Sequence, residues 1–169
     1  MNSEERRAKI VEILRAQKKP VSGSELAKIF NVTRQVIVQD IAILRAAGNE
    51  ILATSQGYTV IEPLGLVTKK VACRHGRDET REELMIFVES GCRVLDVIVE
   101  HPIYGEIHGM LMLTSSKDVE EFINKMSENR ASLLSELTKG VHLHTVQAIN
   151  EDSINKACEA LKKKGILLE

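Results

Sequence analysis

Residues that end or cap helices, such as Pro20 and Gly48, recur closely in the first 50 residues of the chain. They limit this part of the chain to helices of a few turns each. Apolar residues recur at helical spacing over residues 3–17, and Pro20 cannot continue that helix. Ser22 stands three residues before Glu25, a capping-box pattern that predicts a second short helix over residues 22–30. Two short helices, one directly after the other, are therefore predicted at the N-terminus.

A third helix and a hairpin are predicted next. Thr33 is a suitable N-cap, and Gly48 closes the helix near residue 47. Residues 51–55 and 58–61 are rich in strand-forming residues and flank a Gln-Gly turn. Three helices followed by a hairpin are the outline of a winged helix-turn-helix, which we assign to residues 1–63.

The predicted third helix has the chemistry needed to read DNA. Arg and Gln side chains offer the paired hydrogen-bonding groups that recognise guanine and adenine edges, and Thr can bind phosphate. We predict DNA contacts by five residues: Thr33, Arg34, Gln35, Gln39 and, in the hairpin, Gln56. The alternative is a helix-turn-helix that contacts only protein. Because one such module covers few base pairs, we expect a homodimer on double-stranded operator DNA.

The charge balance limits how the chain can bind nucleic acid. The formal net charge is −1, without the basic excess of a strong non-specific DNA binder. Basic residues outnumber acidic ones by two up to residue 63, whereas acidic ones outnumber basic ones by three beyond it. We therefore predict modest non-specific affinity and specificity that depends on the third helix and on dimerisation.

The sequence predicts a cytoplasmic protein with no membrane partner. No run approaches the ~20 apolar residues of a spanning helix, and the charged N-terminus lacks an apolar signal core. Three widely spaced cysteines argue against a disulfide framework. Cys73 and Cys92 lie in apolar surroundings and are interpreted as buried structural residues, although either is a soft metal ligand in principle.

From residue 66 to residue 169 strands and helices alternate. Strands are predicted over residues 67–73, 94–99, 107–113, 141–148 and 165–168, and helices over 78–90, 116–129 and 152–164. Short connections between neighbouring strands favour an α+β fold with a mainly antiparallel sheet and helices on one face. The chain has no Gly-rich phosphate loop and no nucleophile elbow.

All five histidines lie in this second part. His142 and His144 are two apart in a predicted strand, so their side chains point to the same face. His75 ends the first strand, and Glu79, Glu82 and Glu83 follow in the next helix. Imidazoles and a carboxylate in this arrangement indicate a transition-metal site. Taken alone, the His-x-His pair is more typical of two half-exposed histidines in a strand; the third histidine and the acid-rich helix favour the metal site.

Four segments carry a resemblance to a known family: His75, Glu83 in Arg-Glu-Glu-Leu, Val-Glu-His-Pro-Ile-Tyr-Gly-Glu ending at Glu106, and Gly-Val-His-Leu-His-Thr ending at Thr145. Together they resemble the three-histidine (3H) domain. Joined to a winged helix, that domain is similar to the niacin-responsive transcription repressors of Gram-positive bacteria and Thermotogales. The resemblance covers nearly the whole chain.

The resemblance implies an HPr-like topology for the second domain, a bound divalent metal and a homodimer. It also implies nicotinic acid as a corepressor that shuts off NAD-biosynthesis or niacin-uptake genes. By position, the implied metal ligands are His75, Glu83, His142 and His144. Three nitrogens and one oxygen suit zinc, nickel, iron or manganese.

The contacts of the effector are less defined by the sequence. Nicotinate is expected either on the metal or beside it, against Arg74 or Arg93. His101 is interpreted as a pocket residue or, alternatively, as a residue that fixes the following turn. Tyr104 offers a hydroxyl or an aromatic face, and His108 is expected on the surface.

We therefore predict a ligand-gated repressor that is not an enzyme. The first alternative is a metal-dependent hydrolase carrying a winged helix, since a metal with an open position activates water. Beyond the four expected ligands, only Asp96, Glu100 and Glu106 offer further acids for such chemistry. The second alternative is a repressor that senses the metal alone.

Overall fold

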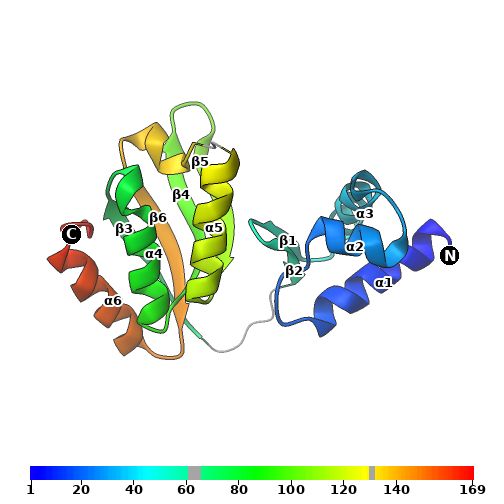
Figure 1. Cartoon of the computed structure of the whole chain (residues 1–169), viewed down its shortest axis with the longest axis horizontal. Helices are drawn as coiled ribbons and strands as arrows, with labels where there is room; N and C mark the ends of the chain where they lie inside the picture. The colour runs from blue at the N-terminus through cyan, green and yellow to red at the C-terminus, as the bar shows by residue number, and fades with distance from the viewer. Residues whose placement is uncertain (61–65, 130–131) are drawn as a thin grey trace. The chain divides into compact units, whose positions relative to one another are not determined.

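The computed structural model describes residues 1–60, 66–129 and 132–169 (Figure 1). The chain divides into two compact units, Met1–Pro63 and Leu64–Glu169. Residues 61–65 include the last predicted hairpin residue, and they lie outside the described residues. The two units are described separately below.

The first unit begins with three capped helices: α1 (Ser3–Ala16), α2 (Gly23–Phe30) and α3 (Arg34–Ala46). The predicted capping box is present, because Ser22 Oγ accepts from the Glu25 amide at 3.1 Å while the Glu25 carboxylate accepts from the Ser22 amide. Thr33 Oγ1 caps α3 by accepting from the Val36 amide at 3.3 Å. Asn31 caps the C-terminus of helix α2 with a left-handed φ of 51°. The chain therefore turns sharply between α2 and α3.

A two-stranded antiparallel wing follows, made of β1 (Ile51–Thr54) and β2 (Gly57–Val60). Tyr58 exchanges two backbone hydrogen bonds with Val21, at 2.8 and 2.9 Å, and so ties the wing to the segment before α2. Three helices and this hairpin form the helical N-terminal region that the sequence predicts.

Gly57 is required where the wing meets Val21. Its φ is +135°, and a Cβ at this position would lie 2.4 Å from the Val21 carbonyl oxygen. We expect Gly57→Ala to lower the free energy of unfolding of the first unit by about 2 kcal/mol, because it combines backbone strain with a steric clash. Urea denaturation followed by circular dichroism measures this loss.

Gly48→Ala is the matched control for the wing. Gly48 also has a positive φ, +94°, but a Cβ there meets nothing within 4 Å. The control therefore carries the strain without the clash, and we expect a smaller loss of stability. Equal losses for the two variants would show that contact with Val21 is unimportant.

A buried carboxylate joins the first and third helices. Asp40 on α3 is only 3% exposed, and its oxygens lie 2.6 Å from Arg6 Nε and 3.4 Å from Arg7 Nη1. Burying a charge without a partner is costly, so these arginines fix α1 against α3. The apolar core beneath them comprises Ile10, Leu14, Val21, Leu26, Ala27, Phe30, Ile37, Ile41, Leu44 and Ile51.

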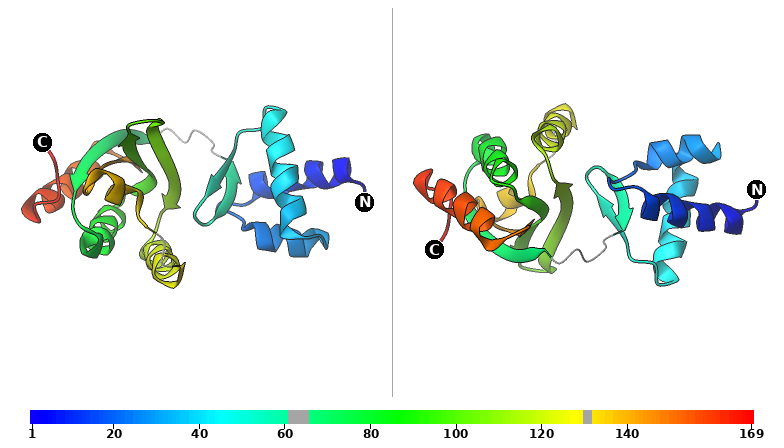
Figure 2. Two further views of the ribbon diagram at one scale, coloured as in Figure 1. Left: turned by 90° about the horizontal axis from the view of Figure 1, so that it is seen from above. Right: turned by 90° about the horizontal axis from the view of Figure 1, so that it is seen from below.

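The second unit is an antiparallel sheet with helices on one face (Figure 2). Its strands are β3 (Val67–Arg74), β4 (Arg93–His101), β5 (Gly105–Leu113) and β6 (Val141–Ala148), in the spatial order β3-β6-β4-β5. The helices are α4 (Thr80–Glu89), α5 (Ser116–Asn129) and α6 (Glu151–Lys163). This α+β arrangement confirms the predicted fold class.

Two short 3-10 helices complete the second unit. The first, η1 (Arg77–Glu79), comes directly before α4, so the segment predicted as one helix from residue 78 begins with a tighter turn. The second, η2 (Leu134–Thr138), lies before β6 and was not expected from the sequence. Both lie close in the chain to the histidines considered below.

The predicted fifth strand, residues 165–168, is wrong. Gly165, with φ +72°, turns the chain back after α6, and Leu167 makes only an isolated bridge to Cys73. Two backbone bonds hold the segment to β3: Arg74 donates to Ile166 at 2.8 Å and Leu168 to Ala72 at 2.9 Å. The apolar pattern that suggested a strand reflects Ile166, which is 1% exposed and packs into the core.

Candidate metal centre and nucleic-acid interface

Strand register brings the histidines of the second unit together. His142 and His144 on β6 lie opposite Cys73 and Val71 on β3. Side chains two residues apart in a strand share a face, and here both imidazoles are buried, at 4% and 3% exposure. His75 directly follows β3 and is also buried. Three imidazoles therefore meet on the face of the sheet that the helices cover.

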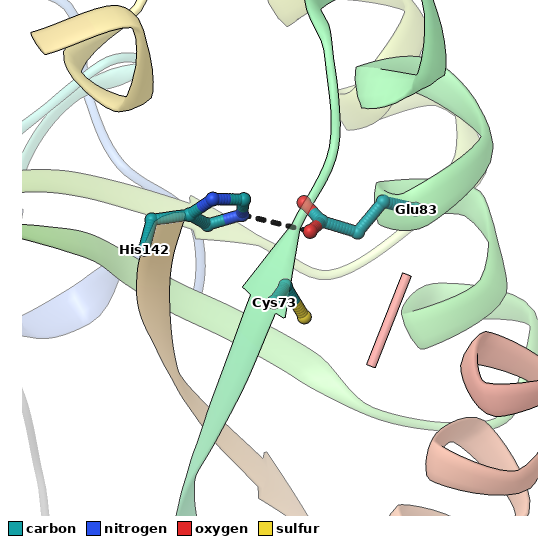
Figure 3. A group of neighbouring side chains, drawn as sticks. All are labelled: Cys73, Glu83 and His142. Atoms are coloured by element: carbon teal, nitrogen blue, oxygen red, sulfur yellow. Dashed lines mark hydrogen bonds and ion pairs between the residues drawn. The ribbon is translucent and has the colours of Figure 1, made fainter. Parts of the chain in front are cut away.

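Glu83 supplies a carboxylate to all three imidazoles. It projects from α4 and is 1% exposed. Its Oε2 lies 2.8 Å from the Nε2 atoms of both His75 and His142, and its Oε1 lies 2.7 Å from His144 Nε2. Figure 3 shows Glu83 reaching toward His142. The four residues that the family resemblance implied are thus brought to one point.

The other nitrogen of each ring fixes the tautomer. A backbone carbonyl only accepts hydrogen bonds, so a ring nitrogen facing it must carry the hydrogen. Each Nδ1 donates in this way: His75 to Gly76 at 2.7 Å, His142 to Gly140 at 2.8 Å and His144 to Asp96 at 2.6 Å. In the neutral ring each Nε2 is therefore left with a lone pair, 2.7–2.8 Å from the carboxylate, and free to bind a metal as in metal-binding histidines.

A lone pair facing a carboxylate requires a positive charge between the two. Burial alone would lower the pKa of His75 and His144, but the Glu83 carboxylate, 2.7–2.8 Å from their Nε2 atoms, leaves both raised. Burial alone would raise the pKa of Glu83, yet the charge on His144 and hydrogen bonds from the imidazoles hold it well below its usual range. Protonation of the imidazoles would supply part of this positive charge, and a divalent metal cation would supply all of it.

The geometry at His75 does not suit a proton shared with Glu83. Its Nε2 is buried and, within the described part of the chain, has no hydrogen bond of acceptable direction, although Glu83 Oε2 is only 2.8 Å away. A cation bound between several donors needs no donor hydrogen pointing at each acceptor. Three imidazole nitrogens and one carboxylate fit zinc, nickel, iron or manganese.

A small cavity of about 30 Å³ adjoins the four residues. It has room for about one water molecule. Its remaining wall is mostly apolar and comes from α4, β4, β5, α5 and the segment around η2: Thr80, Leu84, Val97, Leu111, Phe122, Leu133, Leu134 and Ser135. We call this the inner cavity.

Thr80 is the polar exception in that wall. It is 7% exposed, and its Oγ1 has no hydrogen-bond partner among the described residues. An unpaired buried hydroxyl costs stability, so Thr80 Oγ1 is a candidate hydrogen-bonding group for a ligand or a water in the inner cavity. Thr80 was not predicted from the sequence, because only the packing of α4 on the sheet shows that its side chain is buried.

A larger, open cavity of about 540 Å³ lies outside the inner one. His75 and Ser135 line both cavities. The outer cavity also includes Arg74, one of the predicted effector contacts, while Arg77 in its wall pairs with Glu136 at 3.1 Å. Arg74 is therefore placed near the mouth of the histidine cluster.

The other predicted effector contacts line neither cavity. His101 Nδ1 accepts hydrogen bonds from the backbone amides of Ile103 and Tyr104, at 3.1 and 3.2 Å, and so fixes the β4–β5 turn. Tyr104 is 77% exposed, and Arg93 is half-buried at the start of β4. Their role in effector binding stays a prediction. His108 lies on the surface beside Glu106, as expected.

The cysteines are buried or partly buried, and all three are free. Burial, reinforced by the nearby Glu83 carboxylate, raises the pKa of Cys73. Burial and the neighbouring Cys158 raise the pKa of Cys92 to about 11. Both cysteines pack in the core of the second unit, as the sequence predicts.

The first unit presents the predicted DNA-reading residues to solvent. Thr33, Arg34, Gln35 and Gln39 are all exposed on and before α3, and Gln56 is half-buried in the turn of the wing. Arg34 Nε lies 3.4 Å from the position of a Cβ on Gly23, so its side chain passes over the start of α2. This surface has the groups and the exposure needed to enter a major groove.

No helix in the described ranges, 1–60, 66–129 and 132–169, is long and apolar enough to cross a membrane.

Comparison with known proteins gives matches for both units. Residues 6–59 match the HTH domain, and residues 68–169 match the 3H domain. Over 166 residues the chain is 46% identical to the probable transcription repressor NiaR of Thermotoga maritima, with 98% of this chain and 95% of that protein covered. It is 44% identical over 168 residues to the transcription repressor NadR of Bacillus subtilis, with 97% and 93% covered.

Proposed function

This chain belongs to the 3H-domain family of transcription repressors, and on that premise we propose that its 3H domain holds a divalent transition metal and senses nicotinic acid. The observation that carries the proposal is the convergence of three imidazole Nε2 atoms on the buried carboxylate of Glu83. We further propose that binding of the acid changes affinity for operator DNA at genes of NAD biosynthesis or niacin uptake.

The metal would be held by His75, Glu83, His142 and His144. When bound, it would supply a positive charge with open positions for an anionic ligand. The protein's own contribution is orientation, since each imidazole is fixed through Nδ1 by a backbone carbonyl. The four residues are buried away from bulk water, which strengthens the attraction of the site for an anion.

The effector would bind in the inner cavity. A small aromatic acid matches its lining, which is apolar at Val97, Leu111 and Phe122 and polar at the histidine cluster and Thr80. Because the cavity of about 30 Å³ is far smaller than a pyridine ring with its carboxylate, the ring would displace side chains such as Leu134. That displacement gives the ligand a way to favour one conformation over another.

Thr80→Val tests this placement of the effector. The substitution keeps the shape of the side chain and removes an unpaired buried hydroxyl, so we expect the free energy of unfolding to rise by about 1 kcal/mol. Loss of a hydrogen bond to the ligand should at the same time weaken nicotinic acid binding by about tenfold. Thermal denaturation and calorimetry with nicotinic acid measure the two effects.

Thr80→Ser is the control, because it keeps the hydroxyl and should bind nicotinic acid nearly as well as the natural chain. Zinc affinity should be unchanged in both variants, since Thr80 is not among the four proposed ligands. Unaltered nicotinic acid binding by Thr80→Val would place the effector elsewhere.

The proposed assembly is a cytoplasmic homodimer. A dimer would place two α3 helices on two operator half-sites, and ligand binding in the 3H domains would alter their spacing through differential affinity for one state. The free cysteines suit a reducing compartment.

Gel-shift titration on operator DNA tests the proposal as a whole. We expect nicotinic acid to change DNA affinity only when the protein is loaded with metal. A response to metal alone would instead identify a metal-sensing repressor. No response to either would contradict the proposal.

The hydrolase alternative finds little support in the site. Glu83 is the only carboxylate in the described lining of the inner cavity, and it already faces three imidazoles. Asp96 accepts from the Thr145 amide and hydroxyl, at 2.7 and 2.9 Å. Glu100 and Glu106 are exposed partners across the β4–β5 ladder. We therefore propose that the chain is not an enzyme.

A further inference from the structure

Cys73 lies in the same side-chain array as the histidines. It is directly opposite His142 in the β3–β6 ladder and two residues before His75. A Cys-x-His pair at the end of β3 therefore faces the His-x-His pair of β6, on the one sheet face that α4 covers. Figure 3 shows Cys73 on its strand beside Glu83 and His142.

The donor atoms are close enough to share an ion. The Cys73 sulfur, a Glu83 oxygen and a His142 nitrogen all lie within 4.8 Å of one another. Zinc binds sulfur at about 2.3 Å and nitrogen or oxygen at about 2.0–2.2 Å, so a sulfur and a nitrogen or oxygen on one tetrahedral ion lie about 3.6 Å apart. Side-chain rotations that bring these donors closer by up to about 1 Å would place them on a common ion.

A second observation points to the same place. The Nε2 of His75 is buried without a hydrogen bond in the described structure, and it lies 2.8 Å from the Glu83 carboxylate that Cys73 approaches. Cys73 itself is 0% exposed and forms no disulfide, so its thiol is free to bond to an ion held by this cluster.

We propose that Cys73 Sγ is a further ligand of the metal in the 3H domain. On binding, the S–H bond breaks, the proton leaves to solvent and the sulfur bonds to the cation. Sulfur favours ions such as zinc, whereas oxygen donors suit manganese and magnesium, so Cys73 biases the site toward zinc. The inference rests on the proposed function, because it requires that the cluster holds a metal.

X-ray absorption spectroscopy of the zinc-loaded full-length chain tests the proposal without any substitution. We expect one sulfur at about 2.3 Å from zinc, in addition to nitrogen and oxygen at about 2.0–2.2 Å. Stoichiometric zinc with only nitrogen and oxygen neighbours would overturn the role of Cys73 and leave the proposed metal site intact. Failure to bind zinc at all would overturn both.

Cobalt(II) absorption gives a second test. The natural chain should show a near-ultraviolet sulfur-to-cobalt charge-transfer band, and Cys73→Ser should lose it while keeping the visible cobalt bands. Cys92→Ser is the matched control, because Cys92 is an equally buried cysteine of the same core and should leave the band unchanged. Persistence of the band in Cys73→Ser would overturn the proposal.

Metal preference supplies the functional readout. Loss of an outer hydrogen-bond partner of a metal ligand already lowers metal affinity about tenfold or more. We therefore expect Cys73→Ser to lower zinc affinity by at least about tenfold and to lower manganese affinity less. An unchanged ratio of zinc to manganese affinity would contradict the proposed bias.

Discussion

Glu83→Gln is expected to abolish tight metal binding. The substitution keeps the size of the side chain but removes the negative charge that faces three imidazoles at 2.7–2.8 Å. Loss of an outer hydrogen-bond partner of a metal ligand already costs about 10–100-fold in affinity, and loss of a charged ligand should cost more. Competition with a chromogenic chelator measures the affinity for zinc or nickel.

Glu82→Gln is the matched control for this experiment. Glu82 precedes Glu83 on α4, but it is exposed and pairs with Lys164 at 2.9 Å instead of facing the cluster. We expect its metal affinity to equal that of the natural chain. Equal affinities for both variants would mean that Glu83 does not bind the metal.

The same pair of variants should differ in thermal stability when metal is present. A ligand at 100 times its dissociation constant stabilises the folded state by about 2.7 kcal/mol, which for a unit of this size raises the Tm on the order of 10 °C. A chelator should therefore lower the Tm of the natural chain and of Glu82→Gln. It should have little effect on Glu83→Gln, because that variant binds metal weakly already.

The local signals in the sequence predicted the elements of the fold well, because they depend on neighbouring residues. Ser22 with Glu25 and Thr33 with Val36 are contacts across three residues, and each is present where the pattern placed it. The predicted strand at residues 165–168 is wrong because the prediction used only the local apolar pattern. Pattern alone does not tell a strand from an apolar residue such as Ile166 that packs singly into the core.

The histidine cluster required both local and long-range information. Period-two alternation places His142 and His144 on one face from the sequence alone. The sequence does not show that α4 covers this face of the sheet. Nor does it show that Glu83, instead of Glu79 or Glu82, faces the imidazoles, because this depends on how the helix packs against the sheet. The family resemblance implied Glu83 as the carboxylate ligand. The structure gives a physical reason for that choice, because the Glu83 carboxylate lies 2.7–2.8 Å from all three imidazoles.

The inner cavity could not be predicted, because its wall is assembled from five separate elements. Thr80 has no motif to mark it, and the exposure of a threonine at the start of a helix is ordinarily high. Asp96 was noted only as an acid, yet its carbonyl fixes His144 and its carboxylate holds Thr145. These roles arise from residues nearly 50 positions apart that the β4–β6 ladder brings together.

Arg34→Ala is expected to lower operator affinity and to relax sequence preference at one base pair in each half-site. A bidentate arginine–guanine contact contributes about 1–3 kcal/mol of discrimination, so the loss is about 5–150-fold for each half-site. Arg34 is exposed at the first position of α3, where recognition helices contact base edges. Gel shifts on an operator selected with the natural chain, and on its single-base variants, measure both effects.

Arg45→Ala separates base reading from charge. It removes the same side chain from the same helix, but Arg45 is exposed in the last turn, about 16 Å along the axis from Arg34. Any loss of affinity from Arg45→Ala should be similar for all DNA sequences and should appear as a smaller dependence on salt, because a phosphate contact carries no sequence information. If Arg34→Ala instead behaved like Arg45→Ala, the N-terminus of α3 would not read bases. If neither variant changed DNA binding, the helix-turn-helix would be a protein-contact surface.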